Sequence, residues 1–314
     1  MNKFDDPRLG NLMSESPNGI IRIGLIGYPI DLGVIRNGGR PGAAGGPEAV
    51  RNLIKKKGAI INSEYGISLE GIEIKDFGDT ILNENDLKTA HLNHKNMVKS
   101  ILDDGYLVIS IGGGNDQSFP NFLGLSEYHE KHFSKSGDSN MLIVNIDAHL
   151  DVRPLLEGDE PHSGSPFRQM LETNTNYSLD FVEFACQGSQ CSSNHVEYVK
   201  MKKGNIIWLK DLQGSLIDHS NKINSTVKRF SQLINDTKHD NVFVSFDVDS
   251  IQSSDCPGVS CPAVTGLTAN EALSICYEAG KCKNKSGSND SCQMARKKSI
   301  VTMPTQRLIL RSEG

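Results

Sequence analysis

Short runs of apolar residues recur along the chain and predict the strands of a buried sheet. They carry few charges and are bounded by glycine, proline or polar residues, which is typical of strands covered on both faces. The runs span residues 20–28, 72–77, 106–111, 142–146, 181–185, 206–209 and 242–246, and the second has the more polar character of an edge strand. Residues 300–311 also favour a short strand, but their pattern indicates no place in the sheet.

Between these runs, apolar residues recur at helical spacing. A helix is expected to begin at Pro47, because proline suits the first helical position, and Val50, Leu53 and Ile54 form its apolar stripe. Further helices are predicted at 87–102, from 167, at 222–235 and at 269–280, the last with Thr268 as its N-cap. Strands that alternate with helices predict an α/β fold, with a parallel sheet covered by helices on both faces.

Composition and charge exclude several classes of protein. The chain has 314 residues, 37% hydrophobic and 23% charged, with a formal net charge of −5. This charge and the lack of a basic helix argue against a nucleic-acid partner, and no apolar run is long enough to predict a membrane span. Residues 1–19 are polar and are expected to form a flexible arm without a signal-peptide core. Seven cysteines without such a signal, at spacings that fit no common zinc site, indicate reduced thiols and a cytoplasmic location.

The stretch from Met141 to Arg153 joins a core strand to a cluster of candidate metal ligands. Asp147, His149 and Asp151 follow the apolar run directly. Buried carboxylates need a neutralising partner, and alternate side chains of an extended segment share a face, so a bound cation would satisfy all three. The alternative interpretation is that these residues cap the next helix and pair with surface arginines.

A second acidic pair, Asp247 and Asp249, follows another core strand. Sites in parallel sheets form at the carboxyl ends of strands, so both pairs are expected to meet there with Asn115, which follows Gly112–Gly114. The three glycines are expected to let the backbone pass close to something bound beside Asn115. Four carboxylates balance two divalent cations, and oxygen ligands with one imidazole favour manganese or magnesium over zinc. Because paired metal ions activate water, the pattern predicts metal-assisted hydrolysis.

Three further side chains are candidates for substrate chemistry. His162 lies in a loop of small residues and is a candidate to transfer a proton to a leaving amine, with a surface histidine as the alternative. Arg153 and Arg168 flank the same region. Either guanidinium can bind a substrate carboxylate through its planar fork, and either can instead pair with the aspartates.

In combination, these motifs resemble the ureohydrolase superfamily, which includes arginase, agmatinase and formimidoylglutamase. The resemblance covers residues 20 to about 280 and rests on Asp147-Ala-His149-Leu-Asp151, Ser245-Phe-Asp247-Val-Asp249, the Gly-Gly-Gly loop before Asn115, and Gly42-Ala-x-x-Gly-Pro47. Three more motifs are most similar to formimidoylglutamase: Asn37-Gly-Gly-Arg40, His162-Ser-Gly-Ser-Pro-Phe-Arg168 and Pro257-Gly-Val-Ser-Cys-Pro262.

The resemblance implies a three-layer α/β/α domain over residues 20–280, a binuclear Mn2+ site and a homo-oligomer. It implies a small-molecule substrate, N-formimidoyl-L-glutamate, which water cleaves to glutamate and formamide in histidine breakdown. Asp147 and Asp247 would bridge both ions. By the same resemblance, His149 and Asp249 complete the ligands of one ion, and Asp151 and Asn115 are ligands of the other. His162 would transfer a proton. The candidates for substrate binding are Arg153, Arg168, Asn37 and Arg40.

Two departures from the family pattern bear on activity. Asn115 stands where most members have histidine, and because a neutral amide oxygen is a weaker donor than imidazole, one Mn2+ is expected to bind less tightly. Residues 281–314 lack a recognisable counterpart of the family's last strand and are expected to be a divergent tail. Two alternatives therefore stay open: hydrolysis of another guanidino substrate, and a catalytically impaired member that acts as a binding or regulatory subunit.

Overall fold

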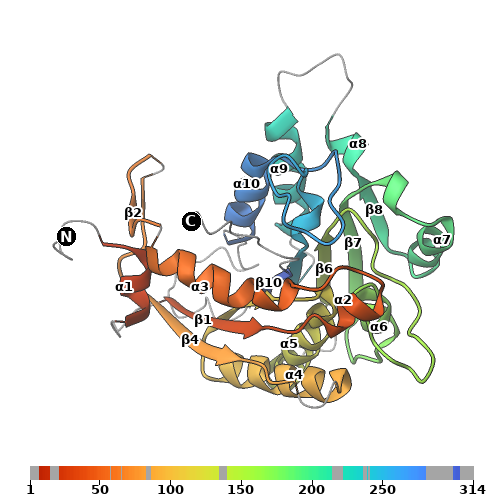
Figure 1. The fold of residues 1–314 in the computed structure, drawn as a ribbon, viewed down its shortest axis with the longest axis horizontal. Coiled ribbons are helices and arrows are strands. Elements are labelled where there is room, and N and C mark those ends of the chain that lie inside the picture. Colours follow the sequence, from red (N-terminus) through yellow and green to blue (C-terminus); the bar gives the residue numbers. More distant parts are fainter. Residues whose placement is uncertain are drawn as a thin grey trace.

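A parallel sheet of eight strands forms the centre of the molecule (Figure 1). The computed structural model describes residues 7–14, 21–56, 58–64, 66–82, 86–133, 140–213, 222–235, 239, 241–280 and 300–304. In sheet order the strands are β4 (Ile72–Asp79), β1 (Ile21–Tyr28), β5 (Leu107–Gly112), β10 (Ile300–Pro304), β9 (Asn241–Phe246), β6 (Asn140–Ile146), β7 (Ser178–Cys186) and β8 (Asn205–Trp208). Each run predicted as a strand forms one, and β4 lies at an edge as expected.

Helices connect the strands, and a small hairpin of β2 (Ile61–Asn62) and β3 (Ile67–Ser68) lies outside the main sheet. The described helices are α1 (Leu9–Ser14), α2 (Leu32–Arg36), α3 (Gly46–Lys56), α4 (Leu87–Asp103), α5 (Ser118–Phe133), α6 (Pro166–Glu172), α7 (Ser193–Met201), α8 (Leu209–Leu212), α9 (Lys222–Ile234) and α10 (Ala269–Gly280). None of them is long and apolar enough to cross a membrane.

Alternate residues of the central strands β6 and β9 pack against opposite helical layers. On β6, Ile143 joins an apolar cluster that includes residues of α4, α5, α6 and α7, while Val144 joins a second cluster with α9 and α10. Figure 1 shows α4 and α5 on one side of the sheet and α9 and α10 on the other. The predicted three-layer α/β/α fold with a mostly parallel sheet is therefore confirmed, and its physical basis is burial of both sheet faces.

Helix capping follows local sequence at the start of α10. The Thr268 hydroxyl accepts a hydrogen bond from the Glu271 backbone nitrogen (3.2 Å), and a Glu271 carboxylate oxygen accepts one from the Thr268 nitrogen (2.8 Å). This reciprocal pair satisfies backbone donors that would otherwise lack partners at the helix start. The cap predicted at Thr268 is confirmed.

Several elements differ from the pattern-based predictions. The pattern predicts neither α5 nor α7, and α1 lies inside the predicted flexible arm, where Leu12 is buried and Leu9 donates a backbone hydrogen bond to Gly58 (2.9 Å). β10 pairs in parallel with both β5 and β9 in the middle of the sheet. Its position depends on partners far away in the chain, which local periodicity does not encode. Residues 281–299 and 305–314 of the predicted tail lie outside the described residues, and the boundaries at 19 and 280 stay predictions.

Candidate metal centre

The candidate ligands follow the carboxyl ends of neighbouring strands. Ile146 and Phe246 are register partners at the ends of β6 and β9, so Asp147 and Asp247 leave the sheet side by side. The Asp247 backbone nitrogen continues the ladder by donating to the Ile146 carbonyl (2.8 Å). Parallel pairing of two core strands thus brings residues a hundred positions apart in the sequence to one edge of the sheet.

Four carboxylates and one imidazole converge at this edge in two overlapping groups. Ligand atoms of Asp147, His149 and Asp249 lie within 4.8 Å of one another, and so do those of Asp147, Asp151 and Asp247. Asp147 belongs to both groups. The convergence expected of these five residues is present, and their roles as ligands remain a proposal.

Backbone hydrogen bonds hold the two acidic turns in shape. Asp147 accepts a hydrogen bond from the His149 nitrogen (2.8 Å), and Asp247 accepts one from the Asp249 nitrogen (3.0 Å). The His149 ring nitrogen Nδ1 lies 3.2 Å from Asp147 Oδ1 and 3.4 Å from Asp249 Oδ2. The backbone of Asp151 is left-handed, with φ of 41°, a conformation uncommon outside glycine that turns the chain away from the strand.

Charge repulsion within this cluster is strong. Burial, followed by the charge of Asp249, raises the pKa of Asp147 to about 6, and burial followed by Asp147 raises the pKa of Asp151 to about 7. Burial, Asp249 and Asp147 raise the pKa of Asp247 well above its usual range. Among the described residues, Oδ1 of buried Asp249 has no hydrogen-bond partner, and Oδ2 has the His149 ring nitrogen at 3.4 Å. Buried carboxylates that face one another are a donor set that fits divalent cations.

Asn115 lies against the same cluster, with its amide nitrogen toward the acids. Nδ2 is 2.7 Å from Asp151 Oδ2 and 3.5 Å from Asp147 Oδ2, while Oδ1 accepts a hydrogen bond from the Ser118 hydroxyl (2.8 Å). Ser118 in turn lies 2.9 Å from the hydroxyl of Ser245 on β9. An amide nitrogen cannot ligate a metal ion, so ligation by Asn115 requires its amide to turn.

The glycines before Asn115 lie close to other atoms of the protein's own chain, and the expectation that they make room for something bound stays a prediction. A Cβ atom on Gly113 would lie 2.2 Å from the Ile30 carbonyl oxygen, and one on Gly112 would lie 1.6 Å from the Gln117 amide nitrogen. Gly113 and Gly114 donate backbone hydrogen bonds to Tyr28 and Ile30. The loop is therefore tightly packed, and the backbone nitrogens of Gly113 and Gly114 have hydrogen-bond acceptors within the chain.

Two predicted substrate-binding residues meet beside the predicted proton donor. A Cβ atom on Gly164 would lie 2.9 Å from Arg153 Cδ and 3.0 Å from Asn37 Nδ2, so both side chains contact this turn. His162 is 2% exposed; its Nε2 donates to the Pro154 carbonyl (3.0 Å), and its Nδ1 accepts from the Gly164 nitrogen (3.2 Å). In this conformation His162 holds the loop together, and its burial contradicts the alternative of a surface histidine.

The other two predicted substrate-binding arginines are engaged elsewhere. Arg168 donates to the Val152 carbonyl (2.8 Å), and its guanidinium lies 3.7 Å from the ring centre of Tyr198 on α7. Arg40 donates to the Val259 carbonyl (2.7 Å) and so ties the glycine-rich loop to the loop that contains Pro257–Pro262. Among the described residues, the partners of Arg168 are the Val152 carbonyl, Glu172 and Tyr198, and the partner of Arg40 is the Val259 carbonyl. None of these partners belongs to the acidic cluster.

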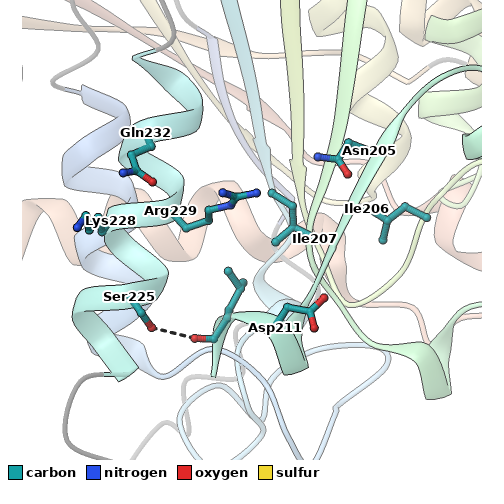
Figure 2. Close-up of a pocket in the computed structure, with 9 residues that line it drawn as sticks. Asn205, Ile206, Ile207, Asp211, Ser225, Lys228, Arg229 and Gln232 are labelled. Carbon is teal, nitrogen blue, oxygen red and sulfur yellow. Dashed lines mark hydrogen bonds between the residues drawn. The ribbon is translucent and has the colours of Figure 1, made fainter. Parts of the chain in front are cut away.

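A cavity between α9 and the edge strand β8 has a different character (Figure 2). Its volume is about 430 Å³, and Arg229 points from α9 toward Ile207 of β8, with Lys228 and Asp211 also at its wall. Ser225 donates to the Leu212 carbonyl at one end (3.0 Å). None of the predicted site residues lines this cavity, which therefore gives no support for the predicted chemistry.

The sequence interpretation missed two buried polar residues directly beneath the acids. Asn145 on β6 donates to Asp147 Oδ2 (3.3 Å) and to Glu183 Oε2 on β7 (2.9 Å), and both residues are fully buried. Burial, followed by the charge of Asp147, raises the pKa of Glu183 well above its usual range. The available signal was a polar residue inside each apolar run, Leu-Ile-Val-Asn-Ile and Phe-Val-Glu-Phe-Ala.

Comparisons with known proteins agree with this arrangement. The sequence profile of the arginase family matches residues 21–290. Formimidoylglutamase of Aeromonas salmonicida is 29% identical over 78% of this chain and 71% of its own, and that of Psychrobacter cryohalolentis is 30% identical over 83% and 77%. Trypanosoma cruzi formiminoglutamase, in its crystal structure with Mn2+, is 36% identical with a TM-score of 0.77 over 96% of this chain and 91% of its own. The chain belongs to the arginase family.

Proposed function

We propose that the chain hydrolyses N-formimidoyl-L-glutamate to glutamate and formamide with two Mn2+ ions. The observation that carries this proposal is the pair of ligand groups that share buried Asp147, because a shared carboxylate is what a two-ion site needs. The substrate class is supported by relatives named formimidoylglutamase and by the Trypanosoma cruzi formiminoglutamase solved with Mn2+.

In this proposal each ligand group holds one ion. Asp147, His149 and Asp249 hold the first, and Asp147, Asp151 and Asp247 hold the second. When bound, the paired ions supply Lewis-acid activation of water at neutral pH. The carboxylates carry the balancing negative charge. Without the ions, protons on Asp147, Asp151 and Asp247, whose pKa values are all raised, relieve part of the repulsion.

Asn115 joins the second group after a rotation of its amide. The Ser118 hydroxyl, which now donates to Oδ1, can accept a hydrogen bond from the amide nitrogen when the oxygen turns toward the ion. The buried amide thus keeps a partner in both orientations. This property makes asparagine compatible with the site at a position where most family members use histidine.

Arg153 is the proposed anchor for the substrate's carboxylates. Its side chain is exposed, carries no ion pair with a described residue, and contacts the Gly164 turn beside Asn37. Its positive charge acts on Asp151, where it opposes the larger effects that raise the pKa of that acid. A guanidinium at this place binds a carboxylate through two parallel hydrogen bonds and orients the formimidoyl carbon toward the acids.

His162 keeps its predicted role in proton transfer to the leaving amine. To act there, Nδ1 must give up the Gly164 hydrogen bond or Nε2 the Pro154 hydrogen bond. Burial, the largest influence, lowers the pKa of His162, so the ring is neutral at physiological pH and able to take a proton before passing it on.

Product assays with and without Mn2+ test the proposal. Release of formamide and glutamate from formimidoylglutamate is measured beside product release from arginine, agmatine and guanidinobutyrate. The expected result is Mn2+-dependent hydrolysis of formimidoylglutamate in preference to the other three. Preference for a guanidino substrate would replace the assigned substrate, and inactivity on all four at saturating Mn2+ would favour a binding or regulatory role.

A further inference from the structure

A row of polar residues crosses the otherwise apolar centre of the sheet, one layer below the acids. In the register of the sheet, Asn145 of β6 is the partner of Glu183 on β7 and of Ser245 on β9. The row continues through β10 to Ser110 of β5, which pairs with the same β10 residue as Ser245. Ser110, Ser245, Asn145 and Glu183 are all fully buried.

Within this row, Asn145 connects Glu183 to a candidate ligand of both ions. Its Nδ2 lies 2.9 Å from Glu183 Oε2 and 3.3 Å from Asp147 Oδ2, so both hydrogens of one amide are directed at carboxyl oxygens. Rotating the amide would place its oxygen between two acceptors, which fixes the orientation of the side chain. The Cys186 thiol, 3.8 Å from the same Glu183 oxygen, adds a contact on the far side.

The side chains of Asn145 and Glu183 include buried polar atoms that destabilise the folded protein, so packing does not explain why polar residues stand here. Asn145 Oδ1 and Glu183 Oε1 are buried without a hydrogen-bond partner among the described residues. An unsatisfied buried polar atom destabilises the folded protein, and apolar residues of similar shape would avoid this loss. Residues that orient a ligand by hydrogen bonding to its outer oxygen are a recognised requirement of metal sites, and that role accounts for the pair.

We propose that Glu183 and Asn145 are positioning residues for the metal centre: Glu183 holds the Asn145 amide, and Asn145 holds the carboxylate of Asp147 in its metal-binding orientation. The inference rests on the proposed Mn2+ site. Neither residue touches the substrate in this account, so both act through Asp147. Ser110 offers a matched control, since it lies in the same row and contacts Gln117 and His94 in place of a candidate ligand.

Mn2+ binding to purified, metal-depleted full-length protein tests the inference without an activity assay. Titration followed by the EPR signal of free Mn2+ gives affinity and stoichiometry, and thermal unfolding reports folding of each variant. Asn145→Val is expected to weaken Mn2+ binding about 10- to 100-fold, the usual effect of removing such a contact. Glu183→Leu is expected to weaken binding by less than Asn145→Val does, because Glu183 acts through Asn145, and Glu183→Gln, which keeps an acceptor for Asn145, is expected to restore it.

The outcomes separate the inference from the proposed function. Wild-type protein that binds no Mn2+ would overturn the proposed function. Wild-type protein that binds Mn2+ while a folded Asn145→Val or Glu183→Leu variant binds it equally well would overturn only the positioning role. If Asn145→Val does not fold, the comparison of Glu183→Leu with Glu183→Gln decides, because both variants leave the Asn145 amide in place. Ser110→Ala is expected to leave the affinity unchanged even where it lowers thermal stability, and an equal loss of affinity there would assign the effect to general packing.

Discussion

Asp249→Asn tests the charge balance of the metal centre, because metal-free stability and metal affinity are expected to change in opposite directions. Burial is the larger cause and the charge of Asp249 the next cause of the rise in the pKa of Asp147 to about 6. A change of one unit in pKa corresponds to about 1.4 kcal/mol. Asp247 has the same two leading causes. Removing the Asp249 charge is therefore expected to stabilise the metal-free protein by about 1–3 kcal/mol.

Thermal unfolding of chelator-treated protein at neutral pH measures this gain. For a chain of 314 residues, 1–3 kcal/mol corresponds to a rise in Tm of about 2–5 °C. Mn2+ titration of the same variant is expected to show at least about 100-fold weaker binding of one ion, since a direct ligand matters more than an outer contact. Asp211→Asn, the same chemical change at an exposed position in the cavity of Figure 2, is expected to shift stability by less than about 0.5 kcal/mol. A lower Tm for metal-free Asp249→Asn than for wild type would refute the reasoning.

Four further predictions concern the pH dependence of the site, Asn115 and the two arginines. Mn2+ affinity is expected to fall as pH drops through about 7 and then about 6, because Asp151 and Asp147 have pKa values raised to these levels and must lose protons to bind metal; equilibrium dialysis across this range checks it. For the same reason the folded metal-free state holds protons that the unfolded state releases, so its Tm should fall as pH rises from about 4 toward 7. The raised pKa of Asp247 should continue this fall at higher pH. Asn115→His is expected to raise the Mn2+ content per chain after dialysis, and an unchanged content would contradict the assigned weakness of the amide ligand. Arg153→Ala should raise KM for formimidoylglutamate about 10- to 100-fold with little change in Tm, and Arg168→Ala should lower Tm with little change in KM; the reverse pattern would exchange their roles.

The strands and the acidic cluster could be predicted from sequence for a shared physical reason. A strand buried on both faces must be an apolar run, as in residues 242–246, and acids that follow such runs directly can only emerge at the carboxyl edge of the sheet. Side-chain partners were not predictable in this way. Arg153 and Arg168 look equivalent in sequence, yet Arg168 is committed to Tyr198 because α6 and α7 pack together, a tertiary contact without a local signature. The partnership of Asn145 with Glu183 likewise depends on the register of two strands.

The central position of β10 has a consequence for how the protein is made. Asn115 follows β5, the candidate carboxylates follow β6 and β9, and β10 pairs with β5 on one side and β9 on the other. During translation both halves of the sheet leave the ribosome before the strand that joins them. On the proposed function, we expect full-affinity Mn2+ binding only after residues 300–304 have emerged, because β10 pairs with the strand before Asn115 and with the strand before Asp247.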